Sequence, residues 1–203
     1  MTKKRLNRED VVRAALELLD DSGYDAVTLR GVAKHLGVHL NSVSFQITTK
    51  ARLFELMAEA ILGELALDDL PDEPRERISE VTRRLRRAML SHRDGGRVIG
   101  GTDTADANAF RYAEVTIGAF LELGVSDVVA VRASFALHCL VIGLVEEEQA
   151  DRPNPHHTPI TAEGFPRLAG MTALLEQESY ADRAEFGINA LITQAVLTAA
   201  APA

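Results

Sequence analysis

Apolar residues recur at three- and four-residue steps along almost the whole chain, which is the period of an amphipathic α-helix. The clearest case runs from Val11 to Leu19, between Asn7, a favourable helix N-cap, and Ser22-Gly23, a pair that ends helices. The same pattern predicts further helices at about 28–36, 39–45, 50–65, 73–92, 104–123, 127–149, 166–178 and 182–199. A glycine-rich joint is expected near 94–101 and an irregular, proline-rich loop at 151–167. Because no strand pattern interrupts the helices and aromatic residues make up only 5%, the chain is predicted to be all-α.

Several classes of protein are excluded by the same sequence. Cys139 is the only cysteine, so a fold held by intrachain disulfides is excluded. No apolar run is expected to reach the roughly 18 residues that a membrane span needs. The basic start, Met1 to Arg5, continues into charged residues where a secretory signal would have an apolar core. These features predict a cytoplasmic protein with no membrane partner.

The net charge of −8 conceals a difference between the two ends of the chain. Residues 1–52 hold nine basic and six acidic residues, a net charge of +3, whereas residues 53–203 hold thirteen basic and twenty-four acidic residues, a net charge of −11. A small basic region on an acidic body could orient that region towards phosphate groups.

Two short predicted helices on either side of Gly37 have the arrangement of a helix-turn-helix. The outward positions of the second helix are polar or aromatic: His39, Asn41, Ser42, Ser44, Phe45 and Gln46. Amide side chains pair with base edges, hydroxyls with edges or phosphates, and phenylalanine with a thymine methyl group. Arg30, Lys34 and Lys50 flank this surface and could bind phosphates. The pattern indicates DNA binding, although a small helical subdomain with a polar surface would share it.

Two groups of residues resemble a known family. The segment from Thr28 to Val38 (TLRGVAKHLGV), with Ser42-Val43 and Lys50, resembles the DNA-binding head of the TetR family of bacterial repressors. The segment from Arg87 to Gly95 (RAMLSHRDG), with Thr102 and the stretch 143–149, resembles the core of the tetracycline-repressor branch of that family. The resemblance extends over about residues 7–198. It implies a helix-turn-helix DNA-binding domain at 1–50 and a helical ligand-binding and dimerisation domain at 51–203.

The resemblance also implies which residues contact DNA. The family's contact positions correspond here to Thr28, Leu29, Arg30, Leu40, Asn41, Ser42, Ser44, Phe45 and Lys50, and His39 joins them as an outward position. Ser44 stands where the family usually has a tyrosine that reaches phosphate, and Gln46 stands where it often has histidine. We therefore expect one backbone anchor to be lost, which puts operator affinity or operator sequence in question.

Two long helices are candidates for a dimer interface. Apolar residues surround much of the helix at 127–149, more than one core-facing side requires, and the helix at 182–199 offers a second apolar set. The candidates are Val128, Val131, Phe135, Leu137, Ile142, Phe186, Ile188, Leu191, Ile192 and Val196. The family builds a four-helix bundle from these positions, so the resemblance implies a homodimer; the alternative is that both helices stay within one monomer.

The ligand pocket departs from that branch of the family. The branch binds a magnesium–tetracycline chelate through polar side chains, and the positions of its histidines, arginine, asparagine, phenylalanine and glutamine are here Ile99, Ala66, Asp103, Val81, Leu85 and Thr116. Thr102 is kept, and Glu147 matches an acidic residue near the metal's water shell. Without the imidazole we expect no metal and no magnesium–tetracycline binding. The resemblance instead predicts a more apolar pocket lined by some of Ala66, Val81, Leu85, Met89, Ile99, Thr102, Thr116, Val131, Ser134 and His138.

These observations predict a ligand-responsive, DNA-binding transcriptional regulator: a homodimeric repressor that leaves a pseudo-palindromic operator when a small, largely apolar effector binds. No cofactor is expected, and no convergent nucleophile or acid–base set indicates an enzyme. Two alternatives remain open, a helical ligand-binding homodimer with weak or lost DNA binding and a tetracycline-type repressor with an altered pocket.

A basic run, Arg77, Arg83, Arg84, Arg86 and Arg87, is interpreted as an ion-paired surface and not as a second nucleic-acid site.

Overall fold

The computed structural model describes residues 6–103, 105–150 and 158–200, and in these ranges every regular element is a helix. The first part of the chain forms α1 (Arg8–Ser22), a 3₁₀ turn η1 (Tyr24–Ala26), α2 (Leu29–His35), α3 (Leu40–Gln46) and α4 (Lys50–Gly63). The second part forms α5 (Pro74–Leu90), α6 (Gly95–Gly100), α7 (Ala107–Glu122), α8 (Asp127–Ala150), α9 (Pro166–Ala169), α10 (Thr172–Gln177) and α11 (Tyr180–Ala200). The all-α prediction is confirmed.

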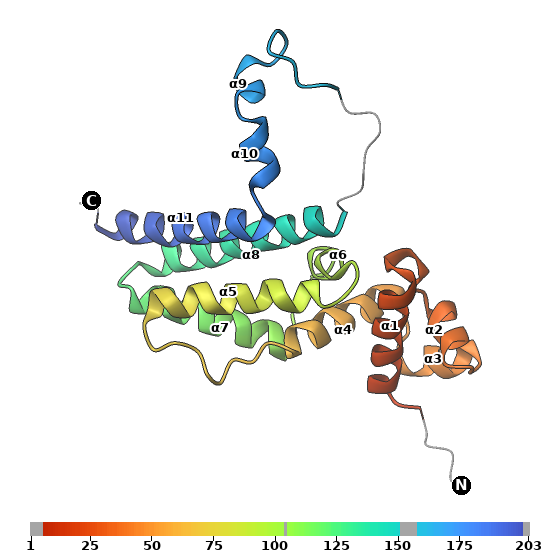
Figure 1. Ribbon diagram of the computed structural model, residues 1–203. Coiled ribbons are helices and arrows are strands. Elements are labelled where there is room, and N and C mark those ends of the chain that lie inside the picture. Colours follow the sequence, from red (N-terminus) through yellow and green to blue (C-terminus); the bar gives the residue numbers. More distant parts are fainter. Residues whose placement is uncertain (1–5, 104, 151–157, 201–203) are drawn as a thin grey trace.

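The chain has a small head and a larger body, which α4 joins (Figure 1). In the head, α1 packs against α2, α3 and α4; in the body, α5, α7, α8 and α11 lie alongside one another. The predicted domain boundary after residue 50 coincides with the first residue of α4. That boundary remains a prediction, because one buried apolar cluster continues from α1 through α4 into α6 and α8.

Local hydrogen bonds explain where the head helices begin. The Asn7 side chain accepts a hydrogen bond from the Asp10 amide at 2.7 Å, and the Asp10 carboxylate accepts from the Asn7 amide at 3.3 Å, so α1 begins with a reciprocal cap. The Thr28 hydroxyl accepts from the Gly31 amide at 2.9 Å at the start of α2. Gly37 has a φ of +64°, a conformation that glycine adopts without strain, and it turns the chain from α2 into α3.

The glycine-rich segment at 94–101 does not form the expected loop, because residues 95–100 are helical and form α6. Glycine is unfavourable inside a helix, but here it allows close packing. A Cβ atom on Gly100 would lie 2.8 Å from a methyl carbon of Ile142 and 2.6 Å from the carboxylate of Glu146, both on α8. A Cβ atom on Gly95 would lie 2.1 Å from the carbonyl oxygen of Met89, a distance that only backbone movement could relieve. The packing of α6 therefore explains the glycines that sequence patterns assign to a loop.

The other helix boundaries lie closer to the predicted ones. Helix α7 begins at Ala107 instead of 104, and α11 begins at Tyr180 instead of 182. The helix expected at 166–178 is divided into α9 and α10 around Gly170. The proline-rich loop is described from residue 158 onwards, and residues 151–157 lie outside the described ranges.

Helix α8 corrects one expectation, because it is long and apolar enough, by length and composition alone, to cross a bilayer. Helices buried in the core of soluble proteins have the same composition, so the property by itself is weak evidence. Only 33% of its apolar window is buried within the single chain. Val128, Val131 and Phe135 remain more than half exposed, while Leu137 and Val141 are fully buried. The helix is therefore apolar both on the side that faces its own chain and on the side that does not.

The basic run on α5 forms the predicted ion-paired surface. Arg83 binds both carboxylate oxygens of Glu185 on α11, at 2.5 and 2.7 Å, and Arg77 binds Glu122 on α7 at 2.7 Å. Arg84 and Arg87 each donate to Glu80 at 2.9 Å, and Arg86 pairs with Glu148 on α8. The Arg83 hydrogen bonds hold the pKa of Glu185 below its usual value. Each arginine of the run has an acidic partner, which leaves little free charge for a second nucleic-acid surface.

Candidate functional site

Helix α3 presents a set of side chains to solvent because its other side is anchored in the head. Val43 and Ile47 are 0% and 2% exposed and hold the helix against α1 and α2. Among the ten predicted DNA-contact residues, seven are exposed: Arg30, His39, Leu40, Asn41, Ser42, Phe45 and Lys50. The exposed fraction of Phe45 reaches 74%, which is unusual for a large apolar side chain without a partner.

The other three predicted contact residues are only half exposed: Thr28, Leu29 and Ser44. The Thr28 hydroxyl is already used to cap α2, and Leu29 packs against the buried cluster. Gln46 does not point freely outwards either, because its side-chain amide donates to the carbonyl of Leu6 at 2.9 Å. Gln46 therefore fixes the segment before α1 beside α3, a role that the sequence pattern did not indicate.

Lys50, the predicted phosphate contact, begins α4. Its ammonium lies over the rings of Phe54 and Tyr24, 5.2 and 5.8 Å from their centroids. These ring contacts hold the charge at the edge of the head while leaving the side chain exposed. The DNA-contact roles of all these residues remain predictions.

A cluster of polar contacts, here called the head–body latch, joins the end of α1 to the turn between α5 and α6. His92 lies between two carboxylates: its Nδ1 is 3.1 Å from Asp20 on α1, and its Nε2 is 3.0 Å from Glu64 at the end of α4. The backbone amide of Arg93 donates to Asp20 at 3.0 Å, and Asp94 accepts from the amide of Tyr24 at 2.8 Å. The resemblance segment RAMLSHRDG thus contacts the head directly.

The latch changes the pKa of His92. Burial lowers this pKa, but the hydrogen bonds that the His92 ring donates to Glu64 and Asp20, together with the charges of both carboxylates, outweigh burial, so the net shift of the pKa is upwards. Only 12% of the His92 side chain is exposed. The protonated form is therefore the one that the latch stabilises.

A cavity of about 380 Å³ lies between α7 and α8, and both α6 and the C-terminal end of α4 contribute to its lining. A volume of this size is within the range of small-molecule sites. Six of the ten predicted ligand residues line it: Ile99, Thr102, Thr116, Val131, Ser134 and His138. Asp103, at the position of the family's arginine, lines it as well, whereas the resemblance did not point to further lining residues that include Leu62, Tyr112, Ile117 and Phe135. Tyr112 could have been found from its position one helical turn before Thr116.

The other four predicted ligand residues do not line this cavity. Val81, Leu85 and Met89 are 0% exposed in the apolar cluster, because the inward side of α5 packs directly against α7 and α8. Ala66 lines a separate, polar hollow beside Arg84 and Glu80. No group of three or more acidic, histidine or cysteine side chains suited to a metal ion occurs in the described part of the chain. Glu147, the match to the family's acidic residue, is exposed on α8.

Comparison with known proteins agrees with this geometry. Residues 11–57 match the family model described as bacterial regulatory proteins, tetR family, and residues 69–193 match the model described as tetracyclin repressor-like, C-terminal domain. The chain is similar to the tetracycline repressor protein class A from transposon 1721 of Escherichia coli, with 35% identity over 74% of this chain and 69% of that protein.

Solved structures show the same fold over most of the chain. A possible TetR family transcriptional regulator from Streptomyces coelicolor A3(2) superposes with a TM-score of 0.85 and 30% identity, covering 96% of this chain and all of that one. BioQ, solved with its natural double-stranded DNA operator, superposes with a TM-score of 0.66 and 30% identity, covering 72% of this chain and 90% of that one.

Proposed function

Because the chain belongs to the TetR family of bacterial regulatory proteins, a family of DNA-binding transcriptional regulators, we propose that it is a cytoplasmic homodimeric repressor. It binds a pseudo-palindromic operator through α3, and a small, largely apolar effector in the α7–α8 cavity releases it. The observation that carries this proposal is the exposed surface of Asn41, Ser42 and Phe45 on a helix whose other side is locked into the head.

The dimer is supported by the apolar surface that one chain leaves uncovered. Helices α8 and α11 pack together, yet Val128 and Phe135 on α8 and Phe186 and Leu197 on α11 are 55–79% exposed. Leu137, Ile188 and Ile192, also predicted for the interface, are instead buried inside the single chain. One head reads too few base pairs for a specific site, so a two-fold dimer that holds two heads one helical turn of DNA apart is the arrangement that suits α3.

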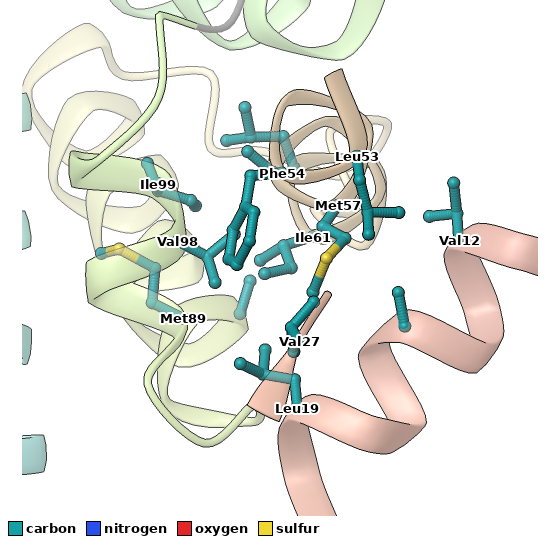
Figure 2. Packing of buried hydrophobic residues seen from close by; sticks show 14 of the residues in the cluster. Val12, Leu19, Val27, Leu53, Phe54, Met57, Ile61, Met89, Val98 and Ile99 are labelled. Carbon is teal, nitrogen blue, oxygen red and sulfur yellow. The ribbon is translucent and has the colours of Figure 1, made fainter. Parts of the chain in front are cut away.

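The cavity is connected to the head by packed side chains. Ile99 lines the cavity and belongs to the buried apolar cluster, where Phe54, Met57 and Ile61 of α4 lie between α6 and Leu19 of α1 (Figure 2). A ligand that displaces α6 would therefore press on α4, and α4 carries the head. The effector can release DNA only by as much as its affinities for the two arrangements differ.

We expect no recognition of magnesium–tetracycline. The cavity has the apolar Ile99 where the family's tetracycline repressors place a metal-binding histidine, and the described residues form no metal cluster. Isothermal titration with tetracycline and magnesium should show no magnesium-dependent binding at micromolar concentrations. Saturable micromolar binding that disappears with a chelator would contradict this expectation and support the tetracycline-type alternative.

Operator binding can be tested by gel shift with DNA that flanks the protein's own gene and with a randomised duplex pool. Asn41→Ala should lose base preference, at a cost of about 1–3 kcal/mol for the preferred sequence, because the amide pairs with base edges. Lys50→Ala should weaken binding to all sequences by a similar factor and reduce its salt dependence.

Arg13→Ala, which removes an exposed cation of α1 that pairs with Asp10 and Glu17, is the control for the Lys50 variant and should change DNA binding little. If Asn41→Ala and Lys50→Ala both reduced binding uniformly across sequences, the assigned roles would be wrong. If the wild-type protein bound none of the duplexes, the alternative of a ligand-binding homodimer without DNA binding would replace the present proposal. The half-buried Ser44, at the family's usual tyrosine position, is the observation that keeps this alternative in view.

A further inference from the structure

Three buried polar atoms around the α7–α8 cavity have no hydrogen-bond partner among the described residues: Tyr112 Oη, Ser134 Oγ and His138 Nδ1. The exposed fractions of Tyr112 and Ser134 are 6% and 9%. Buried polar groups are almost always hydrogen-bonded in native proteins. Three unpaired atoms on residues that line one hollow could therefore be paired by a molecule that enters it.

The three residues come from two neighbouring helices. Ser134 and His138 are one turn apart on α8, and Tyr112 lines the cavity from α7, where its ring packs beside that of His138 with the centroids 6.0 Å apart. The hydroxyl of Thr116, one turn after Tyr112, donates its proton to the Tyr112 backbone carbonyl at 2.8 Å, so that proton does not serve the phenol oxygen. The polar group of a ligand would thus meet atoms from both helices.

The protonation states of the two rings favour an uncharged ligand. Burial raises the pKa of Tyr112 to about 12, so the phenol keeps its proton at pH 7. Burial lowers the pKa of His138, so the imidazole is neutral at pH 7. The cavity lining includes the carboxylate of Asp103 but no lysine or arginine among the described residues, so an anion would find no counter-charge.

We propose that Tyr112, Ser134 and His138 bind a carbonyl or hydroxyl oxygen of an uncharged, mostly aromatic effector, which deepens and rests on the ligand-responsive function proposed above. The phenol and the serine hydroxyl donate to that oxygen, and where the ligand group is a hydroxyl it can donate its proton to Nδ1 of the neutral imidazole. Phe135, Ile117 and Val131 provide apolar walls for the rest of the molecule. Ordered water is the competing occupant, since a polar cavity of this size can hold it.

A matched pair of probes separates these occupants. Benzophenone and diphenylmethane have similar sizes and ring systems, but only benzophenone has a carbonyl oxygen. Isothermal titration should show benzophenone binding at least about tenfold more tightly than diphenylmethane, because a site built for hydrogen bonding rejects the analogue that lacks the acceptor. The anion 4-benzoylbenzoate should bind more weakly than benzophenone. Photocrosslinking by bound benzophenone, followed by peptide mapping, should label α7 or α8.

Tyr112→Phe removes only the hydroxyl group and should abolish most of the preference for benzophenone. In the ligand-free protein the same substitution should leave the melting temperature unchanged or raise it, because the hydroxyl has no partner to lose. If the hydroxyl were hydrogen-bonded within the ligand-free protein, its removal would instead lower the melting temperature. Tyr180→Phe, in a tyrosine outside the cavity lining, is the matched control and should change neither quantity.

Equal affinity of the wild-type protein for the two probes would overturn the proposal. An affinity ratio that is unchanged in Tyr112→Phe would overturn it too, and either result would leave water as the occupant. Failure of both probes to bind would overturn it as well. All of these measurements are made without DNA, so their failure is distinct from failure of operator binding, which the gel shift decides.

Discussion

Phe186→Asp should convert the dimer into monomers at micromolar concentration and weaken operator binding by at least about a hundredfold. Phe186 is 79% exposed on α11 in the single chain. In a two-fold interface each substitution occurs twice, so two carboxylates would be buried without partners. A monomer presents one α3 helix and reads half of a palindromic site, which removes most of the specific affinity.

Light scattering after size-exclusion chromatography measures the mass, and gel shift measures the affinity. Cys139, which is exposed on α8 in the single chain, supplies a second readout: its thiol should react slowly in the wild-type dimer and quickly in the variant. Phe110→Asp is the matched control, because Phe110 is 61% exposed on α7 and lines a hollow with Leu67 and Arg111 to which neither α8 nor α11 contributes. A Phe186→Asp protein that remains dimeric, or a monomer that binds the operator as the wild type does, would exclude this interface.

The parts of the fold that follow from local sequence were predictable, and those that depend on tertiary packing were not. Asn7, Thr28 and Gly37 determine helix ends and a turn through their own backbone and side-chain chemistry. By contrast, α6 exists because Gly96 and Gly100 allow close contact with α8, and no local pattern shows that contact. Glycine at these positions is favourable for packing and unfavourable for the isolated helix.

The candidate sites show the same division. The outward residues of α3 followed from helical period, because Val43 marks the inner side and fixes the others. The cavity lining was predicted only in part: six of the ten residues proposed from the family resemblance line it, whereas Val81 and Leu85 fall on a side of α5 that is completely covered in this chain. The hydroxyl of Tyr112 is buried without a partner by the packing of α7 against α8, which no local sequence pattern shows.

The head–body latch should make the stability of the protein depend on pH through His92. The pKa of His92 is raised in the folded protein above its value of about 6.5 in the unfolded chain. The contribution of His92 to the free energy of unfolding is therefore fully present below about pH 6.5, and it is lost as the pH rises through the folded-state pKa. We expect His92→Gln to lower the free energy of unfolding by about 1–2 kcal/mol at pH 6, with a smaller difference at pH 8.5.

Urea unfolding at a fixed protein concentration, repeated across this pH range, measures the difference. His35→Gln is the control, because His35 pairs with Glu17 inside the head at 3.2 Å and does not connect head and body. Hydrogen exchange adds the location: amides of α1 should lose protection in His92→Gln at pH 6, since Asp20 loses one of its two contacts with the body while the Arg93 amide remains. A pH-independent difference would mean that His92 acts through packing alone. If only amides of the body helices lost protection, the contact between His92 and Asp20 would not be what holds the head to the body.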